Sequence, residues 1–468
     1  MTGPASTLAV ILAAGQGKRM RSSTPKVLHR VAGRPLLAWV LEAARGAGCD
    51  RILCVVGHGA DEVRAELAAP DVEFVVQEER RGTGHALAQT EAAIDVAARV
   101  VVLSGDVPLV TAATLEALLA AAADGWGALA VARVDEPGSL GRVLARSDDP
   151  GALERIVEAA DADPEVLALD TINAGIYVLP APAIFTELAA LTSDNAQGEL
   201  YLTDAVSAAA ARGEAVRLVH LEDADEALGV NDRVDLVRVR RAFLRRKNAD
   251  LLTSGVTLWE PRRTVVEPGV VVGRDTEIEP DVTLLGATRV GTGCRLGQGV
   301  WVRDSVVADG AVIEAYSVLD RAEVGPEAKV GPYARLRPGA VLGRGAKVGN
   351  YVELKNTRLG DGAKAGHLAY LGDAEVGAGA NVGAGTITCN YDGVDKHRTR
   401  IGEDAFIGSD TMLVAPVEVG RDASTGAGSV ITGDVPDGAL AVGRARQRNL
   451  EGWSRRKRRG KKSGKKNG

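Results

Sequence analysis

The feature that most constrains this chain is a six-residue period of aliphatic residues that begins near Arg263. A period of six matches neither the 3.6-residue turn of an α-helix nor the two-residue alternation of a strand. It is typical of a triangular solenoid, in which each six-residue unit forms a flat face and a corner and its aliphatic side chain points inward. The expected inward positions are Val266, Val272, Ile278, Leu284, Val290, Leu296 and Val302, then, after a slip, Val312, Val318, Val324, Val330, Leu336, Leu342, Val348 and Leu354.

One coil of such a solenoid takes three units, or eighteen residues. Arg337 and Lys355 are separated by eighteen residues, so they are expected to stack on one face and to clamp a phosphate between them. The period breaks near residues 387–400, where a polar, turn-rich segment is expected to project as a loop, often on the binding face of a solenoid.

Composition supports small, tightly turned interiors, because the chain has 56 glycines and only 3% aromatic residues. The net charge of −6 is uneven, since residues 454–468 carry nine Lys or Arg and no acid. The acidic remainder argues against a nucleic-acid-binding body. The basic tail is expected to be disordered and solvated, and electrostatic docking to an anionic partner is the alternative.

Cysteine usage and hydropathy favour a cytoplasmic protein. Cys49, Cys54, Cys294 and Cys389 form no CxxC pair, which is typical of a reducing compartment. The apolar run at residues 8–14 has no charged segment before it and is interpreted as a buried strand instead of a signal peptide. No stretch approaches the roughly 18 apolar residues that a membrane span needs.

The first 230 residues alternate short Val-, Ile- and Leu-rich runs with alanine-rich amphipathic segments. This alternation predicts a Rossmann-like α/β domain with a mostly parallel sheet, whose ligands bind at the carboxyl ends of the strands. The expected strands are residues 8–13, 51–56, 72–77 and 100–103. The expected domains are residues 1–233, a basic amphipathic helical linker at 234–254, the solenoid at 255–453 and the tail at 454–468.

Several loops after these strands carry groups suited to a nucleotide. Gly15 and Gly17 precede Lys18 and Arg19 at a strand-to-helix turn, where backbone N–H groups and cations suit a triphosphate; a plain tight turn is the alternative. Lys26 adds a second cation.

Two further loops complete the expected nucleotide site. Gln77, Gly82 and Thr83 form a loop with neutral hydrogen-bonding groups. Asp106 follows an apolar strand and is a candidate Mg²⁺ ligand, with Asn231 as a second oxygen; a helix cap is the alternative for Asp106.

Taken together, these segments resemble the sugar-nucleotide pyrophosphorylases, and most of all the bifunctional bacterial GlmU family. The motifs occur in the family's order in both halves and cover nearly the whole chain except the basic tail. The resemblance implies uridylyl transfer from UTP to N-acetylglucosamine-1-phosphate in the N-terminal domain, with Mg²⁺. It implies acetyl transfer from acetyl-CoA to glucosamine-1-phosphate in a left-handed β-helix, and a homotrimer that shares its acetyl sites between subunits.

The resemblance also implies roles for matching residues of the N-terminal domain. Asp106 and Asn231 would hold Mg²⁺, Gln77, Gly82 and Thr83 would contact the uracil, and Gly141, Glu158 and Asn173 would contact the sugar. The remaining members of the nucleotide-sugar site are Leu12, Ala13, Ala14, Gly15, Arg19, Lys26 and Gly105. Ser104 departs from the family, in which Tyr is frequent at this position.

In the β-helix, His367 matches the family's general base, and an imidazole beside a phosphate clamp suits N-acylation of an amino sugar phosphate. Glu353 is a candidate orienting residue of this site. The resemblance assigns Arg337, Lys355, Tyr370 and Asn381 to the sugar phosphate, and Ala384, Asn390, Tyr391, Ser409, Ala427 and Arg444 to acetyl-CoA. The alternative is a single-activity nucleotidyltransferase whose β-helix is only a scaffold.

Overall fold

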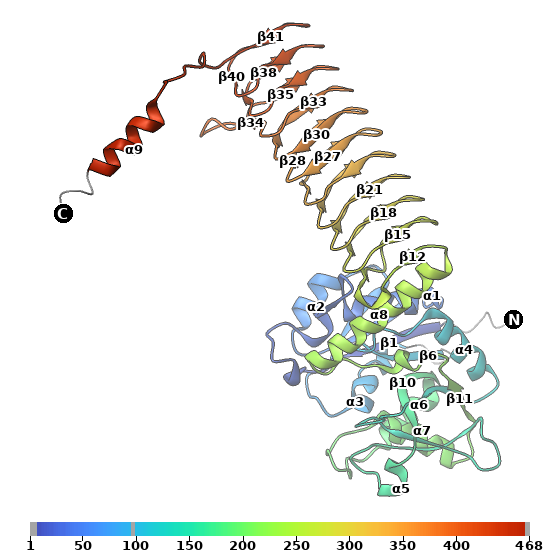
Figure 1. Cartoon of the computed structure of the whole chain (residues 1–468). Helices are drawn as coiled ribbons and strands as arrows, with labels where there is room; N and C mark the ends of the chain where they lie inside the picture. The colour runs from blue at the N-terminus through green and yellow to red at the C-terminus, as the bar shows by residue number, and fades with distance from the viewer. Residues whose placement is uncertain (1–6, 95–98, 464–468) are drawn as a thin grey trace, which may run out of the picture. The chain divides into compact units, whose positions relative to one another are not determined.

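The computed structural model describes residues 7–94 and 99–463, with side chains up to residue 458 (Figure 1). The chain divides into two compact units, residues 1–247 and residues 248–468.

The first unit is built on a mixed, mostly parallel sheet in the order β11-β7-β10-β6-β1-β4-β5. The four runs expected to be strands form β1, β4, β5 and β6, which pair parallel with one another. β10 pairs antiparallel with both β6 and β7, and β8 and β9 form a hairpin beside it. The strands are β1 (Thr7–Ala13), β4 (Arg51–Val56), β5 (Val72–Val76), β6 (Arg99–Ser104), β7 (Gly127–Arg133), β8 (Arg142–Ala145), β9 (Leu153–Val157), β10 (Thr171–Pro180) and β11 (Val216–His220).

Helices cover both faces of this sheet, which is why the central strands are apolar along their whole length. Helices α1 (Leu36–Gly46), α2 (Ala60–Leu67) and α4 (Ala112–Ala123) pack on one face. Helices α3 (Thr83–Ala88), α6 (Ala181–Ala189) and α7 (Leu202–Ala211) pack on the other, and α5 is the short turn Pro164–Leu167. The loops at the carboxyl ends of β1, β5 and β6 remain free to build a site.

The second unit is a parallel β-helix of three sheets, as the six-residue period predicts (Figure 1). The sheets run from β12 (Thr257–Leu258) to β41 (Leu440–Ala441), from β13 (Val265–Val266) to β40 (Val430–Ile431), and from β14 (Val271–Val272) to β38 (Val417–Val419). Strand β25 (Arg335–Leu336) pairs in register with β28 (Glu353–Lys355), so Leu336 lies on Leu354 inside the coil stack. One aliphatic core fills the interior along the whole stack.

The prediction that Val312 and Val318 point inward is wrong. Ile313 and Leu319 are fully buried, whereas Val318 is 36% exposed. The corner after β19 (Trp301–Arg303) turns through Asp304 with a positive φ of 47°, and the next inward residue after Val302 is Val307, five positions on. Val302 therefore pairs with Leu319 after a coil of seventeen residues, and the inward series moves by one residue.

The segment between the two halves forms α8 (Arg233–Thr253), where the amphipathic spacing predicts a helix. The basic tail was expected to be disordered, but residues Trp453–Ser463 form helix α9. Lys and Arg are good helix formers, and Lys457 lies 4.8 Å from the ring centroid of Trp453 one turn away. Residues 464–468 of the expected disordered tail lie outside the described part of the chain.

Candidate active sites

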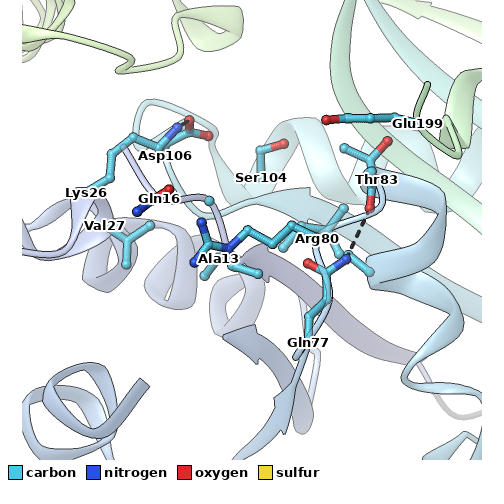
Figure 2. A pocket seen from close by; sticks show the side chains of 15 residues that line it. Ala13, Gln16, Lys26, Val27, Gln77, Arg80, Thr83, Ser104, Asp106 and Glu199 are labelled. Carbon is cyan, nitrogen blue, oxygen red and sulfur yellow. Dashed lines mark hydrogen bonds and ion pairs between the residues drawn. The ribbon is translucent and has the colours of Figure 1, made fainter. Parts of the chain in front are cut away.

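A cavity of about 370 Å³ opens at the carboxyl ends of β1, β5 and β6 (Figure 2). It brings together most of the residues expected to bind the nucleotide, although they are far apart in the sequence. Its lining consists of Leu12, Ala13, Ala14, Gly15, Gln16, Lys26, Val27, Gln77, Arg80, Gly82, Thr83, Ala86, Ser104, Asp106 and Glu199.

One end of this cavity is charged. The Lys26 ammonium and the Asp106 carboxylate form an ion pair there, with side chains that are 14% and 18% exposed. The backbone N–H of Val230 donates to the carbonyl of Asp106 (2.9 Å), which places Asn231 beside it. The amide oxygen of Asn231 accepts a hydrogen bond from Arg19 (3.1 Å). The two cations expected to hold phosphates, Lys26 and Arg19, thus each contact one of the two candidate Mg²⁺ ligands, Asp106 and Asn231.

The other end of the cavity carries the neutral side chains of Gln77 and Thr83, with the Glu199 carboxylate beside Thr83 (Figure 2). Buried Gln77 donates from its amide to the carbonyl of Gly82 (3.3 Å), and the Thr83 hydroxyl accepts from the N–H of Leu202 (3.1 Å). Gly82 has φ 106° and ψ 178°, a conformation open essentially only to glycine. The loop can therefore present backbone and amide groups closely to a flat base.

The three residues expected to hold the sugar form a separate cluster. The N–H of Asn173 donates to the carbonyl of Gly141 (2.9 Å), and the Glu158 carboxylate accepts from the Thr203 hydroxyl (2.9 Å). Burial raises the pKa of Glu158, which the Thr203 hydrogen bond partly offsets. Gly105 donates its N–H to the carbonyl of Leu12 at the end of β1 (2.9 Å).

The second candidate site lies on the β-helix. Arg337 pairs with Glu353 (2.8 Å), and the N–H of Arg337 donates to the carbonyl of Leu354, so Arg337 and Lys355 occupy adjacent coils as the spacing predicts. Tyr370 begins β31 (Tyr370–Gly372) and pairs in register with Glu353. Asn381 instead begins β33 (Asn381–Val382), in the neighbouring sheet, where it pairs with Lys364.

Glu353, the candidate orienting residue, forms an ion pair with Arg337 through its carboxylate. The partner of His367 is Asn350, whose amide oxygen lies 2.7 Å from Nδ1 of the imidazole. The two residues are opposite each other in the register of β27 (Lys347–Asn350) and β30 (Lys364–His367).

The residues expected to hold acetyl-CoA continue from His367 along the coil stack. Ala384, Ser409 and Ala427 follow His367 at the same corner on successive coils, where their small side chains leave room. Asn390, at the base of the projecting loop, donates to Asp373 (2.6 Å), while Tyr391 is 60% exposed. The Arg444 side chain passes beside Gly428, next to Ala427.

Comparison with known proteins covers both units. Residues 9–208 match the MobA-like NTP transferase domain, residues 262–358 the GMPPB C-terminal domain, and residues 398–433 the bacterial transferase hexapeptide (six repeats). The bifunctional protein GlmU of Pelobacter propionicus is 47% identical over 449 residues, which are 95% of this chain and 97% of that protein. The chain belongs to the bifunctional GlmU family.

A second relative and one solved structure are also similar to this chain. The bifunctional protein GlmU of Azotobacter vinelandii is 50% identical and covers 95% of this chain and 98% of its own. A solved structure described as UDP-glucose pyrophosphorylase complexed with UDP-glucose has a TM-score of 0.43 and 19% identity, and covers 52% of this chain and 100% of its own.

As a member of the GlmU family, the chain is a bifunctional enzyme, a nucleotidyltransferase and an acetyltransferase. Among the helices that the structure describes, none combines the length and the apolar character that crossing a bilayer requires.

Sequence reasoning missed several residues of both sites. Arg80 reaches across the middle of the nucleotide cavity, but it stands in the run Glu78-Glu79-Arg80-Arg81, where nothing distinguishes one charge from the next (Figure 2). In the β-helix unit, Lys396 of the projecting loop lies beside Lys355, and its ammonium group lowers the pKa of Lys355. A lysine in an insertion has no periodic signal, so only the folded loop reveals it.

Proposed function

We propose that this chain makes UDP-N-acetylglucosamine, a precursor of peptidoglycan, in two steps at two sites. The β-helix, residues 255–453, acetylates glucosamine-1-phosphate with acetyl-CoA. Residues 1–233 then transfer a uridylyl group from UTP to N-acetylglucosamine-1-phosphate and release pyrophosphate. The observation that carries the proposal is 47% identity to a bifunctional GlmU over 95% of the chain.

In the acetyl transfer, Arg337 and Lys355 bind the phosphate of the amino sugar, and Lys396 adds a third cation. A phosphate between the two lysines relieves the repulsion that lowers the pKa of Lys355. Tyr370 and Asn381 contact the sugar. His367 removes a proton from the ammonium group, and the free amine attacks the thioester carbonyl.

The tetrahedral intermediate then expels CoA as the thiolate, which takes up a proton. The corner formed by Ala384, Ser409 and Ala427 gives the pantetheine arm an open path beside His367. The Ser409 hydroxyl or a neighbouring backbone N–H stabilises the oxyanion. Asn390, Tyr391 and Arg444 hold the rest of acetyl-CoA.

In the uridylyl transfer, Gln77, Gly82 and Thr83 contact the uracil at their end of the cavity. Gly15, Arg19 and Lys26 hold the phosphates, and Arg80 adds a cation between these ends. The phosphate oxygen of the bound sugar attacks the α-phosphorus of UTP in line, and pyrophosphate leaves. Such a reaction depends mainly on positioning and charge neutralisation.

Asp106 and Asn231 would hold a magnesium ion. A carboxylate and an amide oxygen are the kind of ligands that Mg²⁺ prefers, and the ion takes its other ligands from phosphates and water. Within the described residues no group of three or more His, Cys, Asp or Glu gathers as a metal site, which fits an ion held largely by its substrate. When bound, Mg²⁺ would neutralise charge on the triphosphate.

We further propose that the chain forms a homotrimer in the cytoplasm. Tyr316, Tyr333 and Tyr351 stack along one corner of the β-helix, with ring centroids 5.4 and 5.5 Å apart. Their exposures of 46%, 48% and 57% provide an aromatic surface of the kind that subunit contacts bury. Sedimentation equilibrium of the purified protein should give three times the chain mass of 48.6 kDa; a monomer would refute the trimer.

A two-part assay tests the proposed function. Purified protein should release CoA from acetyl-CoA only when glucosamine-1-phosphate is present, and pyrophosphate from UTP only with N-acetylglucosamine-1-phosphate. His367→Ala should abolish the first activity and preserve the second. Full CoA release by His367→Ala, or pyrophosphate release without CoA release by the unmodified protein, would refute the assignment.

A further inference from the structure

We propose that Asn350 is a positioning residue for acetyl transfer, which holds His367 in the tautomer that can remove the ammonium proton. The inference rests on the proposed acetyltransferase function of His367. Asn350 was not among the residues that the sequence singled out.

The contact is built into the backbone of two coils. Asn350 and His367 face each other at the ends of β27 and β30, which have four residues each, whereas the other strands of their sheet have two. The N–H of Leu368 also donates to the carbonyl of Asn350 (3.0 Å), which fixes the chain on either side of the contact.

Two glycines allow this extension of the ladder. A Cβ atom on Gly349 would stand 1.8 Å from the carbonyl oxygen of Gly366, so no larger residue fits between the coils at that point. The ladder therefore continues past Gly349 and Gly366 to the next pair, and it sets Asn350 directly against the imidazole.

The chemistry of the contact determines which ring nitrogen is free. A neutral imidazole carries one N–H, and the amide oxygen of Asn350 can only accept, so the 2.7 Å contact places the proton on Nδ1. Nε2 then keeps its lone pair, and it has no hydrogen-bond partner in the part of the chain that the structure describes. His367 is exposed, so Nε2 is available to a substrate ammonium group.

The opposite amide orientation would reverse this outcome. If the Asn350 NH₂ donated to Nδ1, the ring proton would lie on Nε2, and the imidazole could not act as a base toward the substrate. Asn350→Asp separates the two cases, because a carboxylate accepts and cannot donate. Asn350→Ala removes the side-chain hydrogen bond to Nδ1 in either orientation.

The experiment compares kcat and KM for CoA release. Asn350→Ala should lower kcat by about 10- to 100-fold, which is smaller than the roughly 10²- to 10⁴-fold that general-base catalysis contributes as a whole. It should leave KM for glucosamine-1-phosphate and acetyl-CoA within about twofold. Asn350→Asp should retain most of the wild-type kcat. ¹⁵N NMR of histidine-labelled wild-type protein, with His367→Ala for assignment, should show the proton on Nδ1.

Two controls identify a structural effect. Gln298→Ala removes an amide from the same corner three coils earlier, where Gln298 contacts Asp281 and not the imidazole, so kcat should not change. Pyrophosphate release by Asn350→Ala should equal that of the wild type.

The outcomes are distinct. Absence of CoA release from the wild type refutes the proposed function itself. Four results would each overturn the positioning role while the proposed function stands. Asn350→Ala could keep the wild-type kcat, or it could raise KM with kcat unchanged. Asn350→Asp could be as slow as Asn350→Ala, or NMR could show the proton on Nε2.

Discussion

Gly82→Ala should damage uridylyl transfer selectively, because the residue combines a strained backbone with a tight contact. Its φ of 106° and ψ of 178° lie in a region that costs a residue with a side chain about 1–3 kcal/mol. The added Cβ would stand 2.5 Å from the carbonyl oxygen of Leu200 and 2.9 Å from its nitrogen.

Relief of that overlap moves a segment that two backbone hydrogen bonds fix. The N–H of Gly84 donates to the carbonyl of Leu200 (2.8 Å), and the N–H of Leu200 donates to the carbonyl of Arg81 (2.7 Å). Loss of one such bond costs about 1 kcal/mol or more. The total is about 2–4 kcal/mol, and because 1.4 kcal/mol corresponds to a factor of ten, kcat/KM for UTP should fall by about 30- to 700-fold.

Gly213→Ala is the matched control. Gly213 also has a positive φ, 93°, but its added Cβ would meet no atom within 4 Å. This variant should lose about 1–2 kcal/mol of stability from backbone strain and keep the wild-type kcat/KM for UTP. Pyrophosphate release measures the effect, and CoA release from the same preparation measures the intact fraction. A Gly82→Ala enzyme with wild-type kcat/KM would refute the argument that this loop conformation forms the nucleotide site.

Three further predictions follow from the same geometry. Asp106→Asn should abolish Mg²⁺-dependent pyrophosphate release and spare CoA release; survival of the metal-dependent activity would contradict the metal assignment. Leu336→Ala, at a fully buried position of the β-helix, should lower the free energy of unfolding by about 2–5 kcal/mol in urea titrations, and a loss below 1 kcal/mol would contradict the assigned core. Burial raises the pKa of Glu158, so the folded state loses stability relative to the unfolded chain as pH rises through that raised pKa. Glu158→Gln should therefore melt at a higher temperature than wild type at pH 8 and show no such gain near pH 4; an equal gain at both values would exclude titration as the cause.

Much of the architecture follows from patterns that are local in sequence. The apolar runs predicted β1, β4 and β6, because strands buried on both faces have few polar positions. They also predicted β5, although this strand lies at the edge of the sheet and contains the exposed Glu73. The loop motifs after these strands also predicted that residues such as Gly15, Gln77 and Asp106 lie close together, since loops at the same edge of a parallel sheet converge. The apolar pattern did not predict that β10 runs antiparallel to β6 and β7, because the direction of a strand depends on how the chain returns to the sheet.

The six-residue period by itself determined the β-helix and one aligned pair, Arg337 with Lys355. Only the tertiary structure decided the partner of His367. A uniform coil of eighteen residues would have placed His367 on Gly349, but that coil has seventeen residues and places it on Asn350. The physical reason is that inward-facing aliphatic residues define the solenoid on average, whereas the length of each corner sets the register. Those corners decide which side chains meet, and the period carries no information about them.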